Sequence, residues 1–245
     1  MSTSIPQRRA LVTGGSGDLG GAICRQLAAQ GRHVIVHANR NIARADEVVA
    51  AIVAEGGSAQ AVAFDVADAQ ASAAALASLL EVGPIQIVVN NAGIHDDAPM
   101  AGMSGEQWHR VIDVSLHGFF NVTQPLLLPM ARTRWGRIVS VSSVAAVLGN
   151  RGQTNYAAAK AALHGASKSL SREMASRGIA VNVVAPGVIE SEMVGESFAP
   201  EVIKQLVPAG RVGKPDEVAA LVAFLCSEAA GYINGQVIGI NGGMG

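Results

Sequence analysis

The chain has 245 residues, of which 18 are basic, 19 are acidic and 49% are hydrophobic. The near-equal numbers of basic and acidic residues exclude the basic surplus typical of nucleic-acid-binding proteins. No apolar run approaches the ~18 residues of a membrane span, and none near the N-terminus forms a secretion signal. Cys24 and Cys226 stand far apart, without the spacing of a metal site or a disulfide framework. We therefore expect a soluble cytoplasmic protein that binds neither nucleic acid nor a membrane.

Short β-branched runs alternate with longer alanine-rich segments along the whole chain. Strands are expected at 10–13, 33–37, 59–64, 85–90, 137–142, 180–184 and 236–240. Helices are expected at 18–30, 42–55, 69–81, 105–132, 153–177 and 215–227. The strands are mostly unbroken apolar runs, which is typical of a sheet covered by helices on both faces. The alternation predicts an α/β fold, a Rossmann-like doubly wound parallel sheet of about seven strands, in a single domain over residues 1–245.

A glycine-rich turn, Thr13-Gly-Gly-Ser-Gly-Asp-Leu-Gly20, joins the first expected strand to the first helix. Gly15, Gly17 and Gly20 fit the spacing G-x-G-x-x-G in the strand–turn–helix context of a dinucleotide site. Glycines let the backbone approach a pyrophosphate, and the helix N-terminus supplies free N–H groups. The turn therefore predicts nucleotide binding. The alternative is an ordinary tight connection between strand and helix.

The second expected strand is followed by Asn39 and Arg40, and no acidic residue occurs between His33 and Arg44. An acidic residue here would hold the ribose 2′-hydroxyl of NAD, whereas an arginine suits the 2′-phosphate of NADP. The sequence thus favours NADPH over NADH, unless Arg40 is only a solvated loop residue. Asp65, after the third strand, either accepts a hydrogen bond from the adenine amine or caps the following turn.

A second small-residue turn, Asn90-Asn-Ala-Gly93, follows the fourth strand and leads into His95-Asp96-Asp97. The spacing of these three residues fits no metal-ligand pattern, so we expect bonds within the loop and no metal site. The remaining histidines show no acidic or nucleophilic partner in the sequence and are interpreted as structural: His33, His37, His109, His117 and His164.

Tyr156 and Lys160 stand four residues apart in helix-forming sequence, so their side chains share one helix face. A positive charge beside a phenol favours the phenolate and brings its pKa towards neutrality, where acid–base catalysis is most efficient. Ser143 directly follows a strand and can donate a hydrogen bond to a substrate oxygen. The three residues predict a site that protonates a carbonyl oxygen. The alternative is an amphipathic helix with an exposed lysine.

In combination, these motifs resemble the short-chain dehydrogenase/reductase superfamily from about Ala10 to Gly243. The resemblance implies that Tyr156 is the catalytic acid and base, that Lys160 lowers its pKa and holds the nicotinamide ribose, and that Ser143 orients the carbonyl. It also implies these cofactor contacts: Gly14, Ser16, Gly17, Asp18, Leu19, Gly20, Asn39, Arg40, Asp65, Val66, Asn91, Ala92, Gly93, Tyr156, Lys160, Pro186, Gly187, Val188 and Ser191.

The second half most resembles bacterial 3-oxoacyl-[acyl-carrier-protein] reductases of the FabG type, as in Gly149-Asn-Arg-Gly-Gln-Thr-Asn-Tyr156 and Val181-Asn-Val-Val-Ala-Pro-Gly187. The two surface arginines that hold the acidic carrier protein in that family align with Arg134 and Arg177. Such charge-assisted contacts steer an acidic partner. The alternative is that both are helix-end arginines facing water.

Two residues depart from the family pattern. Asp18 stands where glycine is usual, after Gly17 at a position that is often basic, and its carboxylate would repel a pyrophosphate unless it caps the helix. Ser115, within Asp113-Val-Ser-Leu116, stands where the family has a catalytic asparagine. We expect its hydroxyl to keep the proton relay working through water.

The resemblance implies an NADPH-dependent reductase of 3-oxoacyl thioesters on acyl carrier protein, in fatty-acid or related polyketide or polyene synthesis. Alternatives are a reductase or dehydrogenase of a CoA ester or a free small alcohol or ketone, and a catalytically weak nucleotide-binding scaffold or redox sensor. Substrate specificity is expected in a loop over residues 187–210, with apolar Ile189, Met193, Val194, Phe198 and Leu206. Family analogy suggests a homotetramer built on the helices at 105–132 and 153–177.

Overall fold

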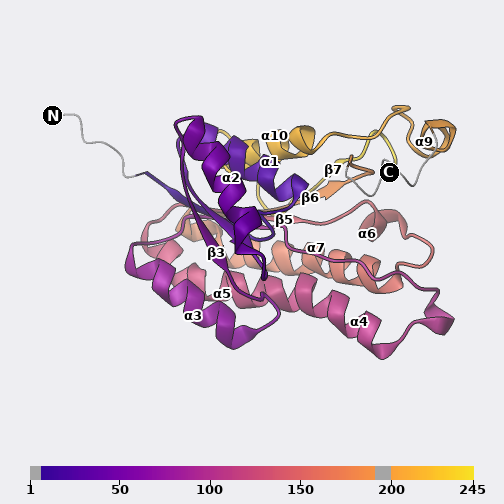
Figure 1. Cartoon of the computed structure of the whole chain (residues 1–245), viewed down its shortest axis with the longest axis horizontal. Helices are drawn as coiled ribbons and strands as arrows, with labels where there is room; N and C mark the ends of the chain where they lie inside the picture. Colours follow the sequence, from indigo (N-terminus) through magenta and orange to yellow (C-terminus); the bar gives the residue numbers. More distant parts are fainter. Residues whose placement is uncertain (1–6, 191–199) are drawn as a thin grey trace.

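A parallel sheet of seven strands runs through the centre of the fold (Figure 1). The computed structural model describes residues 7–190 and 200–245. The strand order is β3-β2-β1-β4-β5-β6-β7, in which the chain crosses from one edge to the middle between β3 and β4. The strands are β1 Arg9–Val12, β2 His33–Ala38, β3 Ser58–Ala63, β4 Ile87–Asn90, β5 Gly136–Val141, β6 Ile179–Pro186 and β7 Val237–Ile240. The predicted doubly wound sheet is confirmed.

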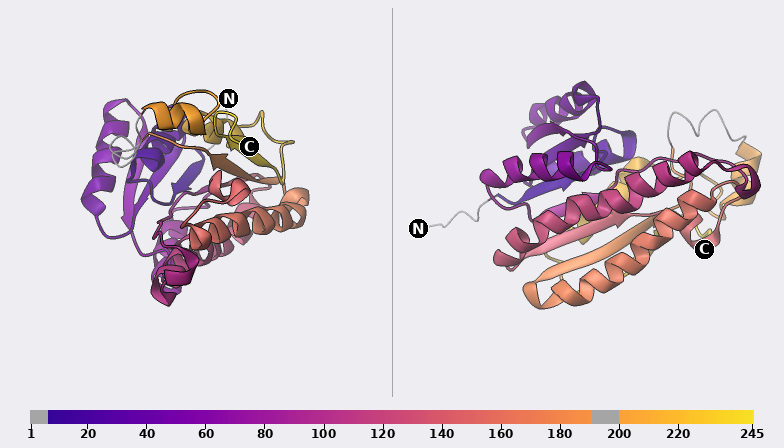
Figure 2. Two further views of the ribbon diagram at one scale, coloured as in Figure 1. Left: turned by 90° about the vertical axis from the view of Figure 1, so that its right-hand side faces the viewer. Right: turned by 90° about the horizontal axis from the view of Figure 1, so that it is seen from below.

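Helices cover both faces of the sheet. One face carries α1 Asp18–Ala29, α2 Ile42–Ala54 and α10 Pro215–Leu225; the other carries α3 Ala69–Glu81, α4 Gly105–Ile112, α5 Gly118–Arg132 and α7 Thr154–Met174 (Figure 1). Shorter elements are η1 Met100–Gly102, η2 Asp113–His117, α6 Ala145–Leu148, η3 Ala175–Arg177 and α9 Pro200–Leu206. In Figure 2, the α4–α5 segment and α7 run side by side, and α4 packs directly against α7.

Each face of the sheet has its own apolar core. Along β2, Val34 and Val36 point into the core beneath α1 and α10, while Ile35 points into the core beneath α3 and α5. All three side chains are fully buried. Burying a side chain of this size contributes about 1.5–3 kcal/mol, which explains why the strands read as unbroken apolar runs. Helices α1 and α10 pack against each other over the first core.

The helix predicted at 105–132 contains an unforeseen interruption. It divides into α4, the π-helical turn η2 and α5. A π-turn inserts one extra residue into the helix, and such insertions recur at functional sites. Hydrophobic periodicity continues on either side of the turn, so the sequence pattern alone does not show it. The other predicted elements are confirmed with ends shifted by up to three residues, the largest shift being the end of α7 at Met174.

The structure describes two parts of the predicted substrate loop, residues 187–190 and 200–210. Ser191, Met193, Val194 and Phe198 lie outside the described residues. On their C-terminal side, the short helix α9 carries Leu206, which is exposed. Within the described ranges, no helix combines the length and apolar composition needed to span a membrane.

Candidate active site

Two cavities meet at the edge of the sheet where the strands end. The larger one has a volume of about 740 Å³ and the smaller one about 280 Å³, and Gly93 and Ile94 line both. The carboxyl ends of parallel strands are where open α/β sheets bind their ligands. Most of the residues predicted to bind a cofactor or catalyse a reaction line one of these two cavities.

The glycine-rich turn forms one wall of the larger cavity, through Gly14, Ser16 and Gly17. Gly14 has a φ of +64°, a backbone conformation that glycine adopts at no steric cost. A Cβ atom on Gly20 would lie 2.1 Å from the carbonyl oxygen of Gly14, so only glycine lets α1 begin this close to the turn. The predicted cradle for a phosphate is therefore present in shape, although Gly20 supports the turn and does not line the cavity.

Asp18 does not cap α1. The N-cap residue is Gly17, and Asp18 is the first residue of the helix, without a side-chain bond to its N-terminus. Asp18 lines a further cavity of about 280 Å³, together with Arg25 and Asp216, and Ser16 and Gly17 line both this cavity and the larger one. The negative charge of Asp18 therefore lies in the first turn of the helix. There it interacts favourably with the positive end of the helix dipole, and it competes with an anion bound at the same place.

The turn after β4 holds the glycine-rich turn in place. The Thr13 hydroxyl accepts hydrogen bonds from the backbone N–H groups of Asn91 and Ala92, both at 3.0 Å. The Asn91 side chain donates to the carbonyl oxygens of Thr13 at 3.0 Å and Gly14 at 3.2 Å. Asn91 thus serves as a clamp between two turns, a role that the sequence does not reveal because its partners are distant along the chain.

Polar residues gather at the far end of the larger cavity. Asn39, Arg40, Asp65 and Val66 all line it, as predicted for the adenosine end of a dinucleotide. Asp65 Oδ1 accepts a hydrogen bond of 2.9 Å from the N–H of Ala67, so the carboxylate caps its turn while it faces the cavity. Both suggested roles of Asp65 are geometrically compatible.

The smaller cavity brings the three predicted catalytic side chains together. Ser143 follows β5, Tyr156 and Lys160 lie in the first half of α7, and all three line the cavity. Lys160 is only 3% exposed, and its Nζ atom donates a hydrogen bond of 2.9 Å to the carbonyl oxygen of Val141. The same Nζ atom lies 5.8 Å from the centre of the Tyr156 ring.

Burial controls the ionisation of both titratable groups. It lowers the pKa of Lys160 to about 8. It raises the pKa of Tyr156, an effect that the Ser143 hydroxyl opposes by hydrogen bonding and that the negative charge of Asp97 reinforces. Desolvation of the phenolate is the largest effect, so the net shift of the Tyr156 pKa in this structure is upward. The predicted role of Lys160 in lowering that pKa stays a prediction. The phenol remains protonated at neutral pH, as a proton donor requires.

Gly93 makes room for the lysine. A Cβ atom at this position would lie 2.9 Å from Lys160 Nζ, closer than ordinary van der Waals contact. The predicted cofactor contact at Gly93 is thus also a residue that sets the place of the ammonium group. Nothing in the sequence pattern ties Gly93 to Lys160, because the two belong to different strand–helix units.

Among the histidines interpreted as structural, His164 and His117 bond to polar side chains. The Ser142 hydroxyl donates to the carbonyl oxygen of Lys160 at 3.0 Å and therefore accepts from His164 Nε2 at 2.8 Å. This chain ties the helix that carries Lys160 to the end of β5. His117 Nδ1 lies 2.8 Å from the Asp113 carboxylate, one helical turn away. The contact between Ser142 and His164 joins residues 22 positions apart, so the sequence does not reveal it. The pair of His117 and Asp113 has i,i+4 spacing and corrects the interpretation that His117 lacks an acidic partner.

Ser115 is buried in the π-turn η2, which packs against α7. The side chain is 4% exposed, and its Oγ atom has no hydrogen-bond partner among the described residues. Ser115 lines neither cavity. A buried hydroxyl without a partner is costly unless water or a ligand satisfies it, which is compatible with the predicted water-mediated relay.

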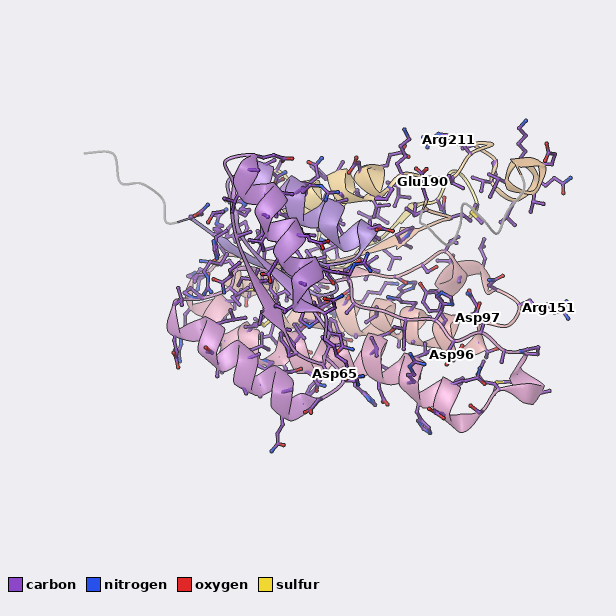
Figure 3. The ribbon with its side chains drawn as sticks, in the orientation of Figure 1. Asp65, Asp96, Asp97, Arg151, Glu190 and Arg211 are labelled. Atoms are coloured by element: carbon purple, nitrogen blue, oxygen red, sulfur yellow. The ribbon has the colours of Figure 1, made fainter. Side chains whose placement is uncertain are left out.

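The loop after Gly93 is held by amide side chains. Asp96 accepts a hydrogen bond of 2.8 Å from Gln107, and Asp97 accepts one of 2.9 Å from Gln153. Figure 3 shows the two carboxylates next to each other, with Arg151 further towards the tip of the molecule. As expected, these residues bond within and around their loop, and they fix the beginning of α7.

The remaining predicted contacts fall into three groups. Pro186, Gly187 and Leu19 line the smaller cavity, as predicted. Val188 lines a separate cavity of about 70 Å³ near Arg211. Ser191 lies outside the described residues.

Arg134 and Arg177 lie close to each other but not to the cavities. Arg134 Nη2 donates a hydrogen bond of 3.3 Å to the carbonyl oxygen of Ser176, and both arginines are exposed. They precede β5 and β6, whereas Ser143 follows β5. Because β5 has six residues and a strand rises about 3.3 Å per residue, its ends lie roughly 20 Å apart. The two arginines therefore belong to the opposite end of the sheet from Ser143.

Comparison with known proteins shows a family match and several relatives of similar length. The family described as "short chain dehydrogenase" matches residues 8–202. The 3-oxoacyl-[acyl-carrier-protein] reductase FabG of Aggregatibacter actinomycetemcomitans is 42% identical over 236 residues, covering 96% of this chain and 98% of its own. The 3-oxoacyl-[acyl-carrier-protein] reductase of Synechocystis is 42% identical over 244 residues, covering 99% and 98%. Nodulation protein G of Azospirillum brasilense is also 42% identical, covering 98% and 99%.

The sheet order, the glycine-rich turn and the Ser143–Tyr156–Lys160 cavity agree with this match over most of the chain. The protein therefore belongs to the short-chain dehydrogenase family.

Proposed function

We propose that the protein is a cytoplasmic NADPH-dependent reductase that converts a 3-oxoacyl thioester, carried on acyl carrier protein, to the 3-hydroxyacyl thioester. The observation that carries the proposal is the cavity that holds Ser143, Tyr156 and Lys160 and opens onto the larger cavity through Gly93 and Ile94. Two of the relatives described above are named as reductases of this substrate. The pathway would be fatty-acid synthesis or a related polyketide or polyene route.

The larger cavity suits a phosphorylated dinucleotide. Its volume, its glycine-lined wall and the open N-terminus of α1 fit a pyrophosphate. Arg40 lines the far end, and Asn39 stands beside it in place of the carboxylate that NAD-binding sites use. Bound NADPH would supply the hydride that reduces the 3-oxo carbon.

The residues of the smaller cavity would manage the proton. Tyr156, whose phenol is held protonated by burial, donates its proton to the carbonyl oxygen of the substrate. Ser143 offers a second hydrogen bond to the same oxygen, and a preorganised pair of donors stabilises the charge that develops there. Lys160 supplies a buried positive charge beneath the phenol as the proton leaves. Ser115 would help to deliver the replacement proton through water.

The carrier protein and the assembly are linked in this proposal. Arg134 and Arg177 offer an exposed positive pair to an acidic carrier, but they lie at the opposite end of the sheet from their own catalytic residues. A homotetramer would resolve the separation by placing the pair of one subunit beside the cavity of another. Phe120 and Leu128 on α5 are 62% and 72% exposed, as expected for a helix that meets a second copy.

The central test follows NADPH oxidation by absorbance, with the same 3-oxoacyl group on carrier protein and on CoA, and with NADH in parallel. We expect faster turnover on the carrier and with NADPH. Tyr156→Phe should abolish turnover and leave NADPH binding intact. If this variant retained wild-type turnover, the assignment of Tyr156, and with it the proposal, would fail.

A second candidate is a reductase of CoA esters or free ketones. The observation that favours it is the distance of Arg134 and Arg177 from the cavity of their own subunit. Arg134→Glu distinguishes the two, with Arg132→Glu as a matched change on the same exposed helix end. A selective loss of activity on the carrier substrate in Arg134→Glu supports the carrier function. Equal activity of both variants on both thioesters supports the second candidate.

A further inference from the structure

His37, at the end of β2, is a fully enclosed histidine in the wall of the larger cavity. It is 1% exposed, yet it is one of the residues that line this cavity. Its Nδ1 atom accepts a hydrogen bond of 3.0 Å from the backbone N–H of Gly14. Its Nε2 atom lies 2.8 Å from the carbonyl oxygen of Phe64. One side chain therefore contacts the turns that follow two different strands.

These bonds define the state of the imidazole. A backbone N–H can only donate, so Nδ1 carries no proton and Nε2 carries the one that is donated to Phe64. Only the neutral ring in this tautomer satisfies both partners. Burial also lowers the pKa of His37 to about 4, which keeps the ring neutral under ordinary conditions. The Phe64 ring packs against the imidazole edge-to-face, with 4.3 Å between the ring centroids.

The two partners of His37 belong to two different segments that border the same cavity. Gly14 is part of the glycine-rich turn, the wall that fits a pyrophosphate. Phe64 directly precedes Asp65 and Val66, which line the adenosine end. Asn91 holds the other side of the Gly14 turn, so the fold does not depend on His37 alone. What His37 adds is a fixed separation between the phosphate wall and the adenosine wall.

We propose that His37 is a positioning residue for the adenosine half of the cofactor, acting as a strut between the glycine-rich turn and the turn that carries Asp65. This inference rests on the cofactor site of the proposed function. It goes beyond that function because it makes the affinity for the cofactor depend on His37, whose two hydrogen bonds are both made to the protein backbone. The sequence suggests only a structural histidine, because both partners are backbone atoms of distant segments.

The test compares three variants by direct binding. NADPH affinity is measured by fluorescence titration, and the affinity of adenosine 2′,5′-bisphosphate, which occupies only the adenosine end, by calorimetry. His37→Leu removes both bonds, whereas His37→Gln offers an acceptor and a donor on one side chain. His33→Gln is the matched control, since His33 begins the same strand and bonds to Ser58 and Gln60, away from the cavity. Melting temperatures and kcat at saturating NADPH complete the comparison.

We expect His37→Leu to weaken NADPH and the adenosine fragment by the same factor, about tenfold, with kcat at saturation within about twofold of wild type. His37→Gln should recover most of the affinity, and His33→Gln should leave it unchanged. The inference would be overturned by wild-type affinity in His37→Leu, by equal losses in His37→Leu and His37→Gln, or by a wild-type protein that binds no dinucleotide. A protein that reduces no thioester but shows the His37 effect would refute the proposed function and support the strut.

Discussion

Gly93→Ala is the sharpest perturbation that the site offers, because it adds one methyl group beside the buried ammonium group of Lys160. The new Cβ atom would lie 2.9 Å from Lys160 Nζ and 3.4 Å from Lys160 Cε. Ordinary contact begins at about 3.5 Å, so the ammonium must move by roughly 0.5–1 Å. Moving it stretches the 2.9 Å bond to the Val141 carbonyl oxygen. A misplacement of about 1 Å can cost on the order of 100-fold in rate.

We therefore expect Gly93→Ala to lower kcat by about 10- to 100-fold while its melting temperature stays within a few degrees of wild type. The flexible end of the lysine can yield without moving backbone, so stability should be little affected. Gly102→Ala is the matched control, since a Cβ atom there meets nothing within 4 Å. Thioester reduction at saturating NADPH is the assay, with NADPH affinity measured separately. A kcat within about twofold of wild type would refute the inference that Gly93 places the ammonium.

Three further results are expected. Ser115→Ala removes a buried hydroxyl without a partner among the described residues, so thermal denaturation should show no loss of stability. The turnover of Ser115→Ala should fall below that of the surface variant Arg132→Ala. Equal turnover of the two variants would exclude the relay role of Ser115. Because the pKa of His37 is lowered from 6.5 to about 4, the unfolded chain takes up the proton first, and stability should fall between about pH 6.5 and pH 4, by at most roughly 3 kcal/mol. Acid titration of the melting temperature should show a shallower slope in His37→Gln, and an unchanged slope would contradict the shift. Gly20→Ala places a Cβ atom 2.1 Å from the Gly14 carbonyl oxygen, so NADPH binding should be lost and the melting temperature lowered; wild-type binding would show that the turn can rearrange.

The fold could be predicted well because its signals are local. Unbroken apolar runs mark strands buried on both faces, and the glycine-rich turn occurs between a strand and a helix. Helix α3 begins and ends at its predicted residues, where Asp68 caps the first turn through the N–H groups of Gln70 and Ala71. The π-turn η2 could not be predicted, because an extra residue in a helix changes neither composition nor the apolar pattern near it.

The site could be predicted in its residues but only partly in its chemistry. Ser143, Tyr156 and Lys160 meet in one cavity because strand ends converge at one edge of a parallel sheet. The net upward shift of the Tyr156 pKa could not be predicted, since it depends on how deeply the fold buries the phenol. The strut at His37 was missed for a similar reason: its partners are backbone atoms that only the tertiary structure brings near.

The distance between Arg134 and the cavity is a further property that no motif reveals. Alignment with a family assigns a role to each position, but it does not say which end of a strand the position occupies. The element bounds supply this, because Arg134 precedes β5 and Ser143 follows it. If Arg134 binds the carrier protein, as the family resemblance implies, the cavity that it serves would belong to a neighbouring subunit.

The packing of α1 against α10 has a consequence for how the protein is made. Helix α1 ends at Ala29, whereas the helix that covers it begins only at Pro215. During translation, the side of α1 that contacts α10 therefore remains exposed until nearly the whole chain has left the ribosome. Exposed apolar surface makes an incomplete chain prone to aggregation. A premature stop before Pro215 would leave that side of α1 exposed permanently. The shortened product should be degraded or aggregate, even though it contains the glycine-rich turn and Ser143, Tyr156 and Lys160.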